Sequence, residues 1–510
     1  MKKFYVTTAI DYVNAPPHLG HAYEKVCADV MRRFKRAKGF DTFFSTGVDE
    51  HSLNVYRQAK DEGISPMEYC NRMVPMFVNS WESLNIEYDR FIRTTDDNHI
   101  KSVRHLLQKI YDKGDIYMDK YKGWYCVSCE AYLQESELVD GKCPVHNKKA
   151  EWFEEDNYFF RLSKYADKLL EHIEKHNGFI LPTTRENEIV NIIKNGLLDI
   201  SISRASEGWG IKLPFDENQI IYVWIDALTN YMSAAGYSDN NKLFNKYWPA
   251  NLHIIGKDIT RFHSIIWPAM LMSGGLTLPE RIYAHGFMTI DGKKMSKTGN
   301  NFIAPDEIVG LAGSDAVRYF VMREMPFGDD MDFTWSRFWG KYNSDLANDF
   351  GNLVSRTFSM VDKYAGGKVP KFEAAEDIDI NYMESIKRPD TDYFKQMENC
   401  QFALALNTVW EIVAKANRYV EETKPWRLNK TPLAAARLGC VLLNLLESLR
   451  IISSYSYPFM PVSSEKVWRA LGMDEDIKEK AFAKVNEWEI LEKGRELVAP
   501  GMLFPRKDIK

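Results

Sequence analysis

The stretch that most constrains the fold of this chain is residues 5–21, YVTTAIDYVNAPPHLGH. Its first half is rich in β-branched and aromatic residues that alternate along the chain, which predicts a buried strand. The Asn-Ala-Pro-Pro segment continues neither a strand nor a helix, so the chain turns there. From His18 to Ala37 the apolar residues fall on one helical face. The sequence therefore predicts a strand, a turn and an amphipathic helix.

Two imidazoles stand at the start of that helix, at His18 and His21, with Gly20 between them. The first turn of a helix has backbone N–H groups without intrahelical partners, and such a terminus suits a polyphosphate. The histidines can donate to phosphate oxygens, and the glycine lets a flat ring approach the backbone. The alternative is that both histidines only cap the helix or face solvent, and a lone HxGH does not decide between the two.

A second stretch, residues 291–300 (DGKKMSKTGN), favours phosphate binding. It is a glycine-flanked loop with three lysines in five residues. A mobile loop with ammonium groups can close over a triphosphate and neutralise charge that develops during transfer. Lys294 and Lys297 are therefore candidate catalytic residues, and Ser296 adds a hydroxyl donor. An ordinary solvated surface turn is the alternative.

The chain contains neither a Walker loop nor a GxGxxG fingerprint. Phosphate binding would then depend on the two histidines and the lysine loop. Groups of this kind suit a triphosphate such as ATP, and they can promote transfer at phosphorus by positioning and charge stabilisation, without a protein nucleophile. Mg²⁺ is the expected partner of ATP.

Composition limits the class of protein. At 510 residues, 45% of them hydrophobic, the chain can form several domains with large cores. The net charge of −5 gives no global positive field, so nucleic acid would be bound by local patches and shape. Seven cysteines favour a reduced, cytoplasmic setting over a disulfide scaffold. We expect no signal peptide, because the first residues run directly into a strand, and no membrane span.

The order of elements predicts one parallel α/β sheet encoded in two halves. Strand and helix patterns alternate over residues 1–115 and again over residues 221–290, and such sheets bind ligands at the carboxyl ends of their strands. Asp49 follows the second strand as His18 and His21 follow the first, so the three are expected at one edge. Further strand-like segments are residues 199–204, 220–224 and 252–258, and a helix is expected from Phe262.

Helical patterns take over from about Trp335. Two apolar stripes, which begin at Phe402 and Leu438, predict a helix bundle. The acidic, proline-containing residues 368–389 are a candidate connection. No further domain is evident after the bundle, and we therefore expect a monomer.

Between the two α/β halves, four potential metal ligands form a spaced array. Cys126-x2-Cys129 is followed, after the thirteen residues 130–142, by Cys143-x2-His146. This spacing is that of a tetrahedral zinc knuckle, and four protein ligands leave no open position, so the zinc would be structural. The alternative is chance or core cysteines, but both halves of the array have the ligand spacing.

Together, HLGH and KMSKT resemble the paired signatures of the class I aminoacyl-tRNA synthetases. Over essentially the whole chain the sequence resembles the methionyl-tRNA synthetases of the bacterial, single-knuckle type. The resemblance implies a Rossmann-like parallel sheet, split by the zinc-knuckle insertion and followed by a C-terminal α-helical bundle. The longer matching strings are YVWIDA (222–227), GKDI (256–259), FH (262–263), NLVSR (352–356) and KPW (424–426).

The resemblance also implies an activity and a division into domains. The chain would make methionyl-adenylate and pyrophosphate from methionine and ATP, and would pass the methionyl group to the 3′-terminal ribose of a methionine tRNA, initiator or elongator. The insertion would guide the acceptor end. The expected units are residues 1–115 (catalytic domain, first half), 116–220 (insertion with the knuckle at 126–146), 221–290 (catalytic domain, second half), 291–345 (KMSKT loop and stem-contact region) and 346–510 (anticodon-binding helices).

Residue roles follow from the resemblance at the matching positions. The implied catalytic residues are His18, His21, Lys294 and Lys297, joined in ATP binding by Gly20, Ser296 and Arg204. Without the resemblance, a surface ion pair would explain Arg204. The implied readers of the anticodon are Asn352, Arg356 and Trp426, because Trp can stack on an unpaired base and Asn and Arg can read base edges.

The implied methionine pocket is largely aromatic, which suits a polarisable thioether. Asp49 matches the carboxylate that holds the α-ammonium group, and Asp258 matches a polar anchor for the adenylate. Without the resemblance, core packing would explain each ring and helix capping would explain Asp49. The full set is Ile10, Tyr12, Asp49, Trp224, Ala227, Tyr231, Asp258, Phe262 and His263.

Two positions depart from the family pattern, and two rival functions remain open. Thr298 stands where serine is usual, and Ser52 stands where glycine is common, which puts the local backbone geometry in question. One rival is a synthetase for another amino acid or another HxGH nucleotidyltransferase. The other is a non-catalytic, zinc-bearing tRNA-binding protein.

Overall fold

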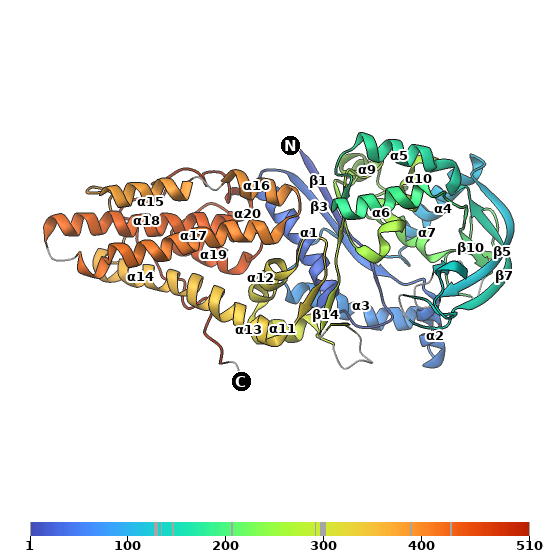
Figure 1. The fold of residues 1–510 in the computed structure, drawn as a ribbon, viewed down its shortest axis with the longest axis horizontal. Helices are drawn as coiled ribbons and strands as arrows, with labels where there is room; N and C mark the ends of the chain where they lie inside the picture. Colours follow the sequence, from blue (N-terminus) through green and yellow to red (C-terminus); the bar gives the residue numbers. More distant parts are fainter. Residues whose placement is uncertain are drawn as a thin grey trace.

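The computed structural model describes residues 2–126, 131–133, 135–144, 147–205, 208–290, 292–295, 302–387, 390–428 and 431–508. The molecule is elongated (Figure 1). A sheet-containing part with its insertion lies at one end, and a helical part, whose long helices run along the long axis, lies at the other. No helix in these ranges is both long enough and apolar enough to cross a membrane.

Seven parallel strands form the main sheet, which confirms the predicted fold class. Their order is β2-β3-β1-β12-β13-β8, with β4 beside β3. The central strand β1 pairs with the first half on one side, Tyr5 opposite Phe43, and with the second half on the other, Val6 opposite Leu252. The bounds are β1 Lys3–Thr8, β2 Asp11–Tyr12, β3 Asp41–Asp49, β4 Arg90–Arg93, β8 Ile180–Leu181, β12 Leu252–Gly256 and β13 Ile282–His285.

Helix α1 (Leu19–Ala37) begins where the sequence predicts and is buried on nearly all sides. It packs on β1 and β3 and also against helices of the C-terminal part. Its buried charges are paired, as the cost of burying an isolated charge requires: Arg33 binds Asp29 at 2.7 Å. The other helices around the sheet are α2 Leu53–Asp61, α3 Pro66–Ser83, α4 Asp97–Asp112, α7 Val223–Leu228, α8 Asn230–Ala234, α9 Asn241–Tyr247 and α10 Trp267–Gly274.

The predicted strand at residues 220–224 is wrong in its second half. Strand β11 (Gln219–Ile221) ends at Ile221, and α7 begins at Val223. Helix α7 is buried through Val223, Ile225 and Leu228, and a short apolar run does not distinguish a buried helix from a buried strand.

The insertion is built on a long hairpin that the sequence patterns did not reveal. Strands β5 (Ile116–Cys126) and β7 (Glu151–Phe160) pair in antiparallel fashion at the edge of the molecule (Figure 1). Much of this hairpin is exposed, so its residues lack the apolar alternation of a half-buried strand. The remaining elements are β6 Ala131–Leu133, β9 Ile200–Ser201, β10 Ser203–Ala205, α5 Ala166–Lys175 and α6 Thr183–Lys194.

A small sheet and three helices connect the catalytic part to the bundle. Strand β14 pairs with β15 and, in parallel, with β16. Lys294 ends β15, and only its backbone is described. The bounds are β14 Met288–Ile290, β15 Lys293–Lys294, β16 Met331–Phe333, α11 Pro305–Ala312, α12 Ser314–Glu324 and α13 Trp335–Lys341.

The C-terminal part is helical, as predicted. The predicted connection at 368–389 is not irregular throughout, because α15 (Asp377–Lys387) lies within it. Tyr382 of α15 stacks on Tyr419 at 3.9 Å, and this tertiary contact offsets the acidic composition. The other helices are α14 Asn352–Ala365, α16 Asp390–Glu398, α17 Phe402–Thr423, α18 Pro432–Ser456, α19 Pro461–Ala470 and α20 Ile477–Lys480.

Candidate active site

The start of α1 holds the two histidines in one defined arrangement. The backbone N–H of Gly20 donates to Nδ1 of His18, and the N–H of His18 donates to Nδ1 of His21, each at 3.1 Å. The rings lie 3.8 Å apart. Since each Nδ1 accepts a hydrogen bond from a backbone N–H, Nε2 carries the ring proton in the neutral form. Both half-buried histidines are therefore set up as Nε2–H donors, the form that a phosphate oxygen needs.

Gly20 is required by this geometry. A side chain at residue 20 would lie 2.9 Å from the ring of His18 and 4.0 Å from Met288. The helix start is thus in close contact with β14, the strand that leads into the lysine loop.

The segment that follows the lysine loop also contacts the start of α1. The N–H of Leu19 donates to the carbonyl oxygen of Ile303 at 3.0 Å, and the ring of Phe302 meets that of His18 edge-on at 6.2 Å. Both flanks of the loop therefore adjoin the histidines. Ser296, Lys297 and Thr298 lie outside the described residues.

Three aromatic rings from separate segments meet beside the sheet edge. Trp224 of α7 stacks on Phe262 at 3.9 Å, with 11° between the planes. Tyr12 of β2 meets Trp224 edge-on at 6.3 Å. Ala227 lies one helical turn after Trp224, and Ile10 precedes β2, so the predicted apolar pocket residues gather in one region.

Tyr231 and His263 form a buried polar pair within this region. Nδ1 of His263 donates to the carbonyl of Ile259 at 3.0 Å, and the Tyr231 hydroxyl lies 2.6 Å from Nε2. Burial lowers the pKa of His263 to about 4, so the ring is neutral at pH 7 and Nε2 accepts from Tyr231. The Tyr231 oxygen then keeps its acceptor capacity for another donor.

The predicted polar anchors lie at the carboxyl ends of their strands. Asp49 is the last residue of β3 and is 2% exposed. Asp258 follows β12 in a short 3₁₀ turn and is exposed. A side chain at Gly256 would lie 2.8 Å from the Asp258 carboxylate, so glycine permits this close approach. Arg204 lies on β10, outside the main sheet, and is half-buried.

Sequence reasoning missed a chain of buried charges beneath the histidines. Lys25 binds Asp11 at 2.7 Å and Glu24 at 3.2 Å, and Glu24 binds His285 at 3.1 Å. Burial raises the pKa of Asp11 to about 6, an effect that Lys25 only partly offsets. Burial alone would also raise the pKa of Glu24, but Lys25 and His285 outweigh it and lower that pKa. The available signal was the Glu24-Lys25 pair inside the apolar pattern of α1.

Two of the four predicted zinc ligands are described. Cys126, at the end of β5, and Cys143 are each 1% exposed, although most neighbouring described residues of this segment are exposed. Cys129 and His146 lie outside the described residues. Three thiols and one imidazole are a donor set that suits zinc, and the burial of the two described thiols agrees with such a site.

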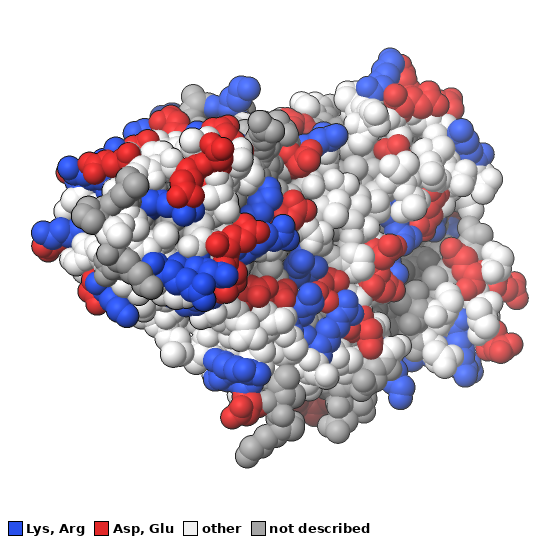
Figure 2. Space-filling view, turned by 60° about the vertical axis from the view of Figure 1, so that its left-hand side comes forward, with Lys and Arg blue, Asp and Glu red and all other residues white. Residues whose placement is uncertain are grey.

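The three predicted anticodon readers lie together on the helical part. Asn352 and Arg356 are one turn apart on α14, and the Arg356 guanidinium lies 6.0 Å over the Trp426 ring. Trp426 is 44% exposed. Arg356 also pairs with Glu421 at 2.8 Å. On the face shown in Figure 2, positive and negative side chains are interspersed, in keeping with the net charge of −5.

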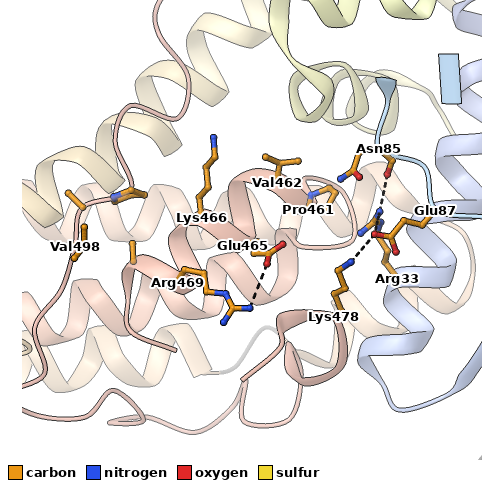
Figure 3. Close-up of a pocket in the computed structure, with 13 residues that line it drawn as sticks. Arg33, Asn85, Glu87, Pro461, Val462, Glu465, Lys466, Arg469, Lys478 and Val498 are labelled. Carbon is orange, nitrogen blue, oxygen red and sulfur yellow. Dashed lines mark hydrogen bonds and ion pairs between the residues drawn. The ribbon is translucent and has the colours of Figure 1, made fainter. Parts of the chain in front are cut away.

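A cavity of about 550 Å³ lies elsewhere, between α1 and the helices α19 and α20 (Figure 3). Lys478 pairs with Glu87 at 2.9 Å, and Arg469 with Glu465 at 3.7 Å. Arg33 donates to the carbonyl of Asn85 at its rim. The described residues that line it include none of the candidate site residues, so this cavity belongs to the contact between the two parts of the molecule.

Comparison with known proteins gives matches over the whole chain. The family model described as tRNA synthetases class I (M) matches residues 4–152 and 136–358, and that of the anticodon binding domain of methionyl tRNA ligase matches residues 369–508. The chain is 46% identical over 513 residues to a methionine–tRNA ligase of Caldanaerobacter subterraneus subsp. tengcongensis, a match that covers 100% of this chain and 80% of that protein.

Solved structures of Mycobacterium tuberculosis methionyl-tRNA synthetase are also similar. The complex with methionyl-adenylate matches with a TM-score of 0.95 and 42% identity, covering 99% of this chain and 100% of that one. The apo form matches with a TM-score of 0.89 and 39% identity, covering 100% of this chain and 99% of that one.

Proposed function

Because this chain belongs to the class I tRNA synthetases, in the family described as tRNA synthetases class I (M), we propose that it joins methionine to tRNA. It forms methionyl-adenylate and pyrophosphate from methionine and ATP, and then transfers the methionyl group to the 3′ end of a methionine tRNA. The observation that carries this proposal is the contact of both flanks of the lysine loop with the helix start that bears His18 and His21.

In the first step, the methionine carboxylate attacks the α-phosphorus of ATP and pyrophosphate leaves. His18 and His21 donate through Nε2–H to phosphate oxygens beside the start of α1, where the helix dipole also favours negative charge. Lys294 and Lys297 neutralise the charge that builds up on the leaving pyrophosphate. Gly20, Ser296 and Arg204 complete the ATP site, and Mg²⁺ enters bound to the ATP phosphates.

Methionine lies against the aromatic cluster. Tyr12, Trp224 and Phe262 bury the thioether, while Ile10 and Ala227 fill the remaining wall. The other residues of the predicted methionine pocket are polar, and they hold the polar groups of the substrate. Asp49 holds the α-ammonium group, Tyr231 with His263 supplies a polar contact in the pocket, and Asp258 anchors the adenylate.

In the second step, the tRNA spans both parts of the molecule. Trp426 stacks on an anticodon base while Asn352 and Arg356 read base edges, and the insertion guides the acceptor end. The domain limits given above, recognition of both initiator and elongator tRNAs, a monomeric state and a cytoplasmic location remain parts of this proposal.

Zinc has a structural role in this proposal. Cys126, Cys129, Cys143 and His146 would hold one zinc ion, which supplies folding free energy to the insertion. Metal analysis of the purified protein should give one zinc per chain. C143S should lose it, whereas C70S, a change at a buried cysteine of α3, should retain it. Equal zinc content in the two variants would exclude the knuckle.

The activity is tested by ATP–pyrophosphate exchange with each of the twenty amino acids in turn. Methionine should support the fastest exchange by a wide margin. Faster exchange with another amino acid would show that the chain activates that amino acid instead. No exchange with any of the twenty would favour the alternative of a non-catalytic tRNA-binding protein. Charging of a methionine tRNA transcript then tests the second step.

A further inference from the structure

A buried carboxylate joins two imidazoles behind the aromatic cluster. Asp226 of α7 is 1% exposed. Its Oδ2 lies 2.7 Å from Nδ1 of His51, and its Oδ1 lies 2.6 Å from Nε2 of His99. Both carboxylate oxygens therefore have a partner, and neither histidine belongs to the proposed catalytic set.

The donors and acceptors of this trio are fixed by its chemistry. Burial alone raises the pKa of Asp226, but His51 and then His99 outweigh it, so the pKa lies below its ordinary value. A carboxylate only accepts hydrogen bonds, so His51 must hold a proton on Nδ1 and His99 must hold one on Nε2. The other nitrogen of His99 lies 2.7 Å from the hydroxyl of Ser233 on α8.

The trio connects the elements that carry the methionine pocket. His51 lies two residues after Asp49, at the end of β3. Asp226 lies on the six-residue helix α7, between Trp224 and Ala227. So short a helix has little stability of its own and depends on tertiary contacts for its position.

We propose that Asp226 is a positioning residue for methionine selection, an inference that rests on the proposed function. By binding His51 and His99 at once, it fixes α7 relative to the end of β3. It thereby sets the distance between the ring of Trp224 and the carboxylate of Asp49. That distance determines which side-chain length fits when the α-ammonium group is held.

D226N tests this inference with little change of shape. An amide has one acceptor oxygen, so its NH₂ group faces the second imidazole, which accepts from it only after changing tautomer, and neither hydrogen bond then ends on a charged group. Hydrogen bonds to a charged group are stronger than those to a neutral one, so we expect α7 to shift. In pyrophosphate exchange, the KM for methionine should rise by about tenfold and the KM for ATP by less than about twofold. The preference for methionine over ethionine, which is one methylene longer, should fall by at least about threefold.

A pair of variants at His51 separates positioning from any direct role of the imidazole. In H51N the amide nitrogen occupies the place of Nδ1 and still donates to Asp226, whereas H51L has no donor. H51N should keep the wild-type preference, and H51L should lose it as D226N does. Loss of the preference in H51N as well would overturn the inference. The pair also provides the test if D226N does not fold.

E447Q is the matched control for loss of a buried charge. Glu447 is 0% exposed in the helical part and binds Arg450 at 2.7 Å. E447Q should lower the melting temperature and leave the ratio of methionine to ethionine unchanged. An unchanged ratio in folded D226N, or an equal fall in E447Q, would refute a positioning role. Failure of the proposed function itself would be recognised separately, because the wild-type protein would then show no methionine-dependent exchange.

Discussion

The backbone N–H of Leu19 donates to the carbonyl oxygen of Ile303 at 3.0 Å. This bond fixes the first turn of α1 to the segment that follows the lysine loop. The loop is anchored on its other side by β14, whose Met288 adjoins Gly20. The described residues on both flanks of the loop therefore lie beside the helix start that bears His18 and His21.

Loss of one imidazole at this helix start should impair the adenylation step far more than tRNA binding. We expect H21A to lower kcat for methionine-dependent exchange by about 10²–10³-fold, the effect of removing one donor that stabilises developing charge. Affinity for tRNA, measured by filter binding, should change by less than about twofold. H105A, at an exposed histidine of α4, is the control and should match the wild type. Normal exchange in H21A would exclude phosphate stabilisation by this histidine.

The Tyr231 hydroxyl should contribute to methionine binding. Y231F removes the donor to the neutral His263 ring and one polar atom from the pocket. Loss of a hydrogen bond worth about 0.5–1.5 kcal/mol should raise the KM for methionine by about 2–12-fold, with ATP unaffected. Y393F removes a buried hydroxyl that donates to Tyr455 in the helical part, and it should leave both KM values unchanged. Equal effects of the two variants would indicate a general loss of stability.

The exposed ring of Trp426 should act only in the tRNA step. W426A should lower the charging rate of methionine tRNA by about 10-fold or more, since base–aromatic stacking contributes about 1–3 kcal/mol. Pyrophosphate exchange without tRNA should be retained. L404A is the control, because Leu404 is 46% exposed and Trp426 is 44% exposed. This variant should retain both charging and pyrophosphate exchange. A parallel fall of exchange and charging in W426A would instead indicate a folding role.

Glu87, at the contact between the two parts, should make stability depend on pH (Figure 3). Burial alone raises its pKa, but Arg33, Lys478 and Arg32 outweigh it and lower the pKa to about 2. Between pH 2 and about 4.5 the unfolded chain binds more protons at this group, so its stabilising contribution is complete above that range and is lost as the pH falls.

We therefore expect E87Q to unfold more easily than the wild type at pH 7, by about 1–2 kcal/mol after allowance for solvent screening. The difference should stay constant down to about pH 5.5 and shrink below about pH 4.5. Urea titrations of both proteins at pH 7, 5.5 and 4 measure this difference in the free energy of unfolding. E465Q, at the weaker pair with Arg469 on the same cavity, should change the free energy of unfolding by less than about 1 kcal/mol at every pH. A difference that grows on acidification would contradict the assignment.

The sequence by itself determined those features whose causes are local. The strand, proline turn and helix around His18 depend on residues within one short stretch, and the structure reproduces them. The long apolar stripes from Phe402 and Leu438 likewise predicted α17 and α18, because helical periodicity is a property of the stretch itself. The predicted strand is wrong at Val223 and Trp224, because this apolar run is too short to show a period.

Only the tertiary structure decided the contacts between segments far apart in the chain. The bond from Leu19 to Ile303, and the carboxylate of Asp226 between two imidazoles, join residues whose order in the sequence gives no sign of contact. The paired hairpin of β5 and β7 is exposed over much of its length and so lacks an apolar pattern. Local sequence determines the long periodic elements, whereas the short or exposed elements and the positions of reactive groups depend on packing free energy shared among many distant residues.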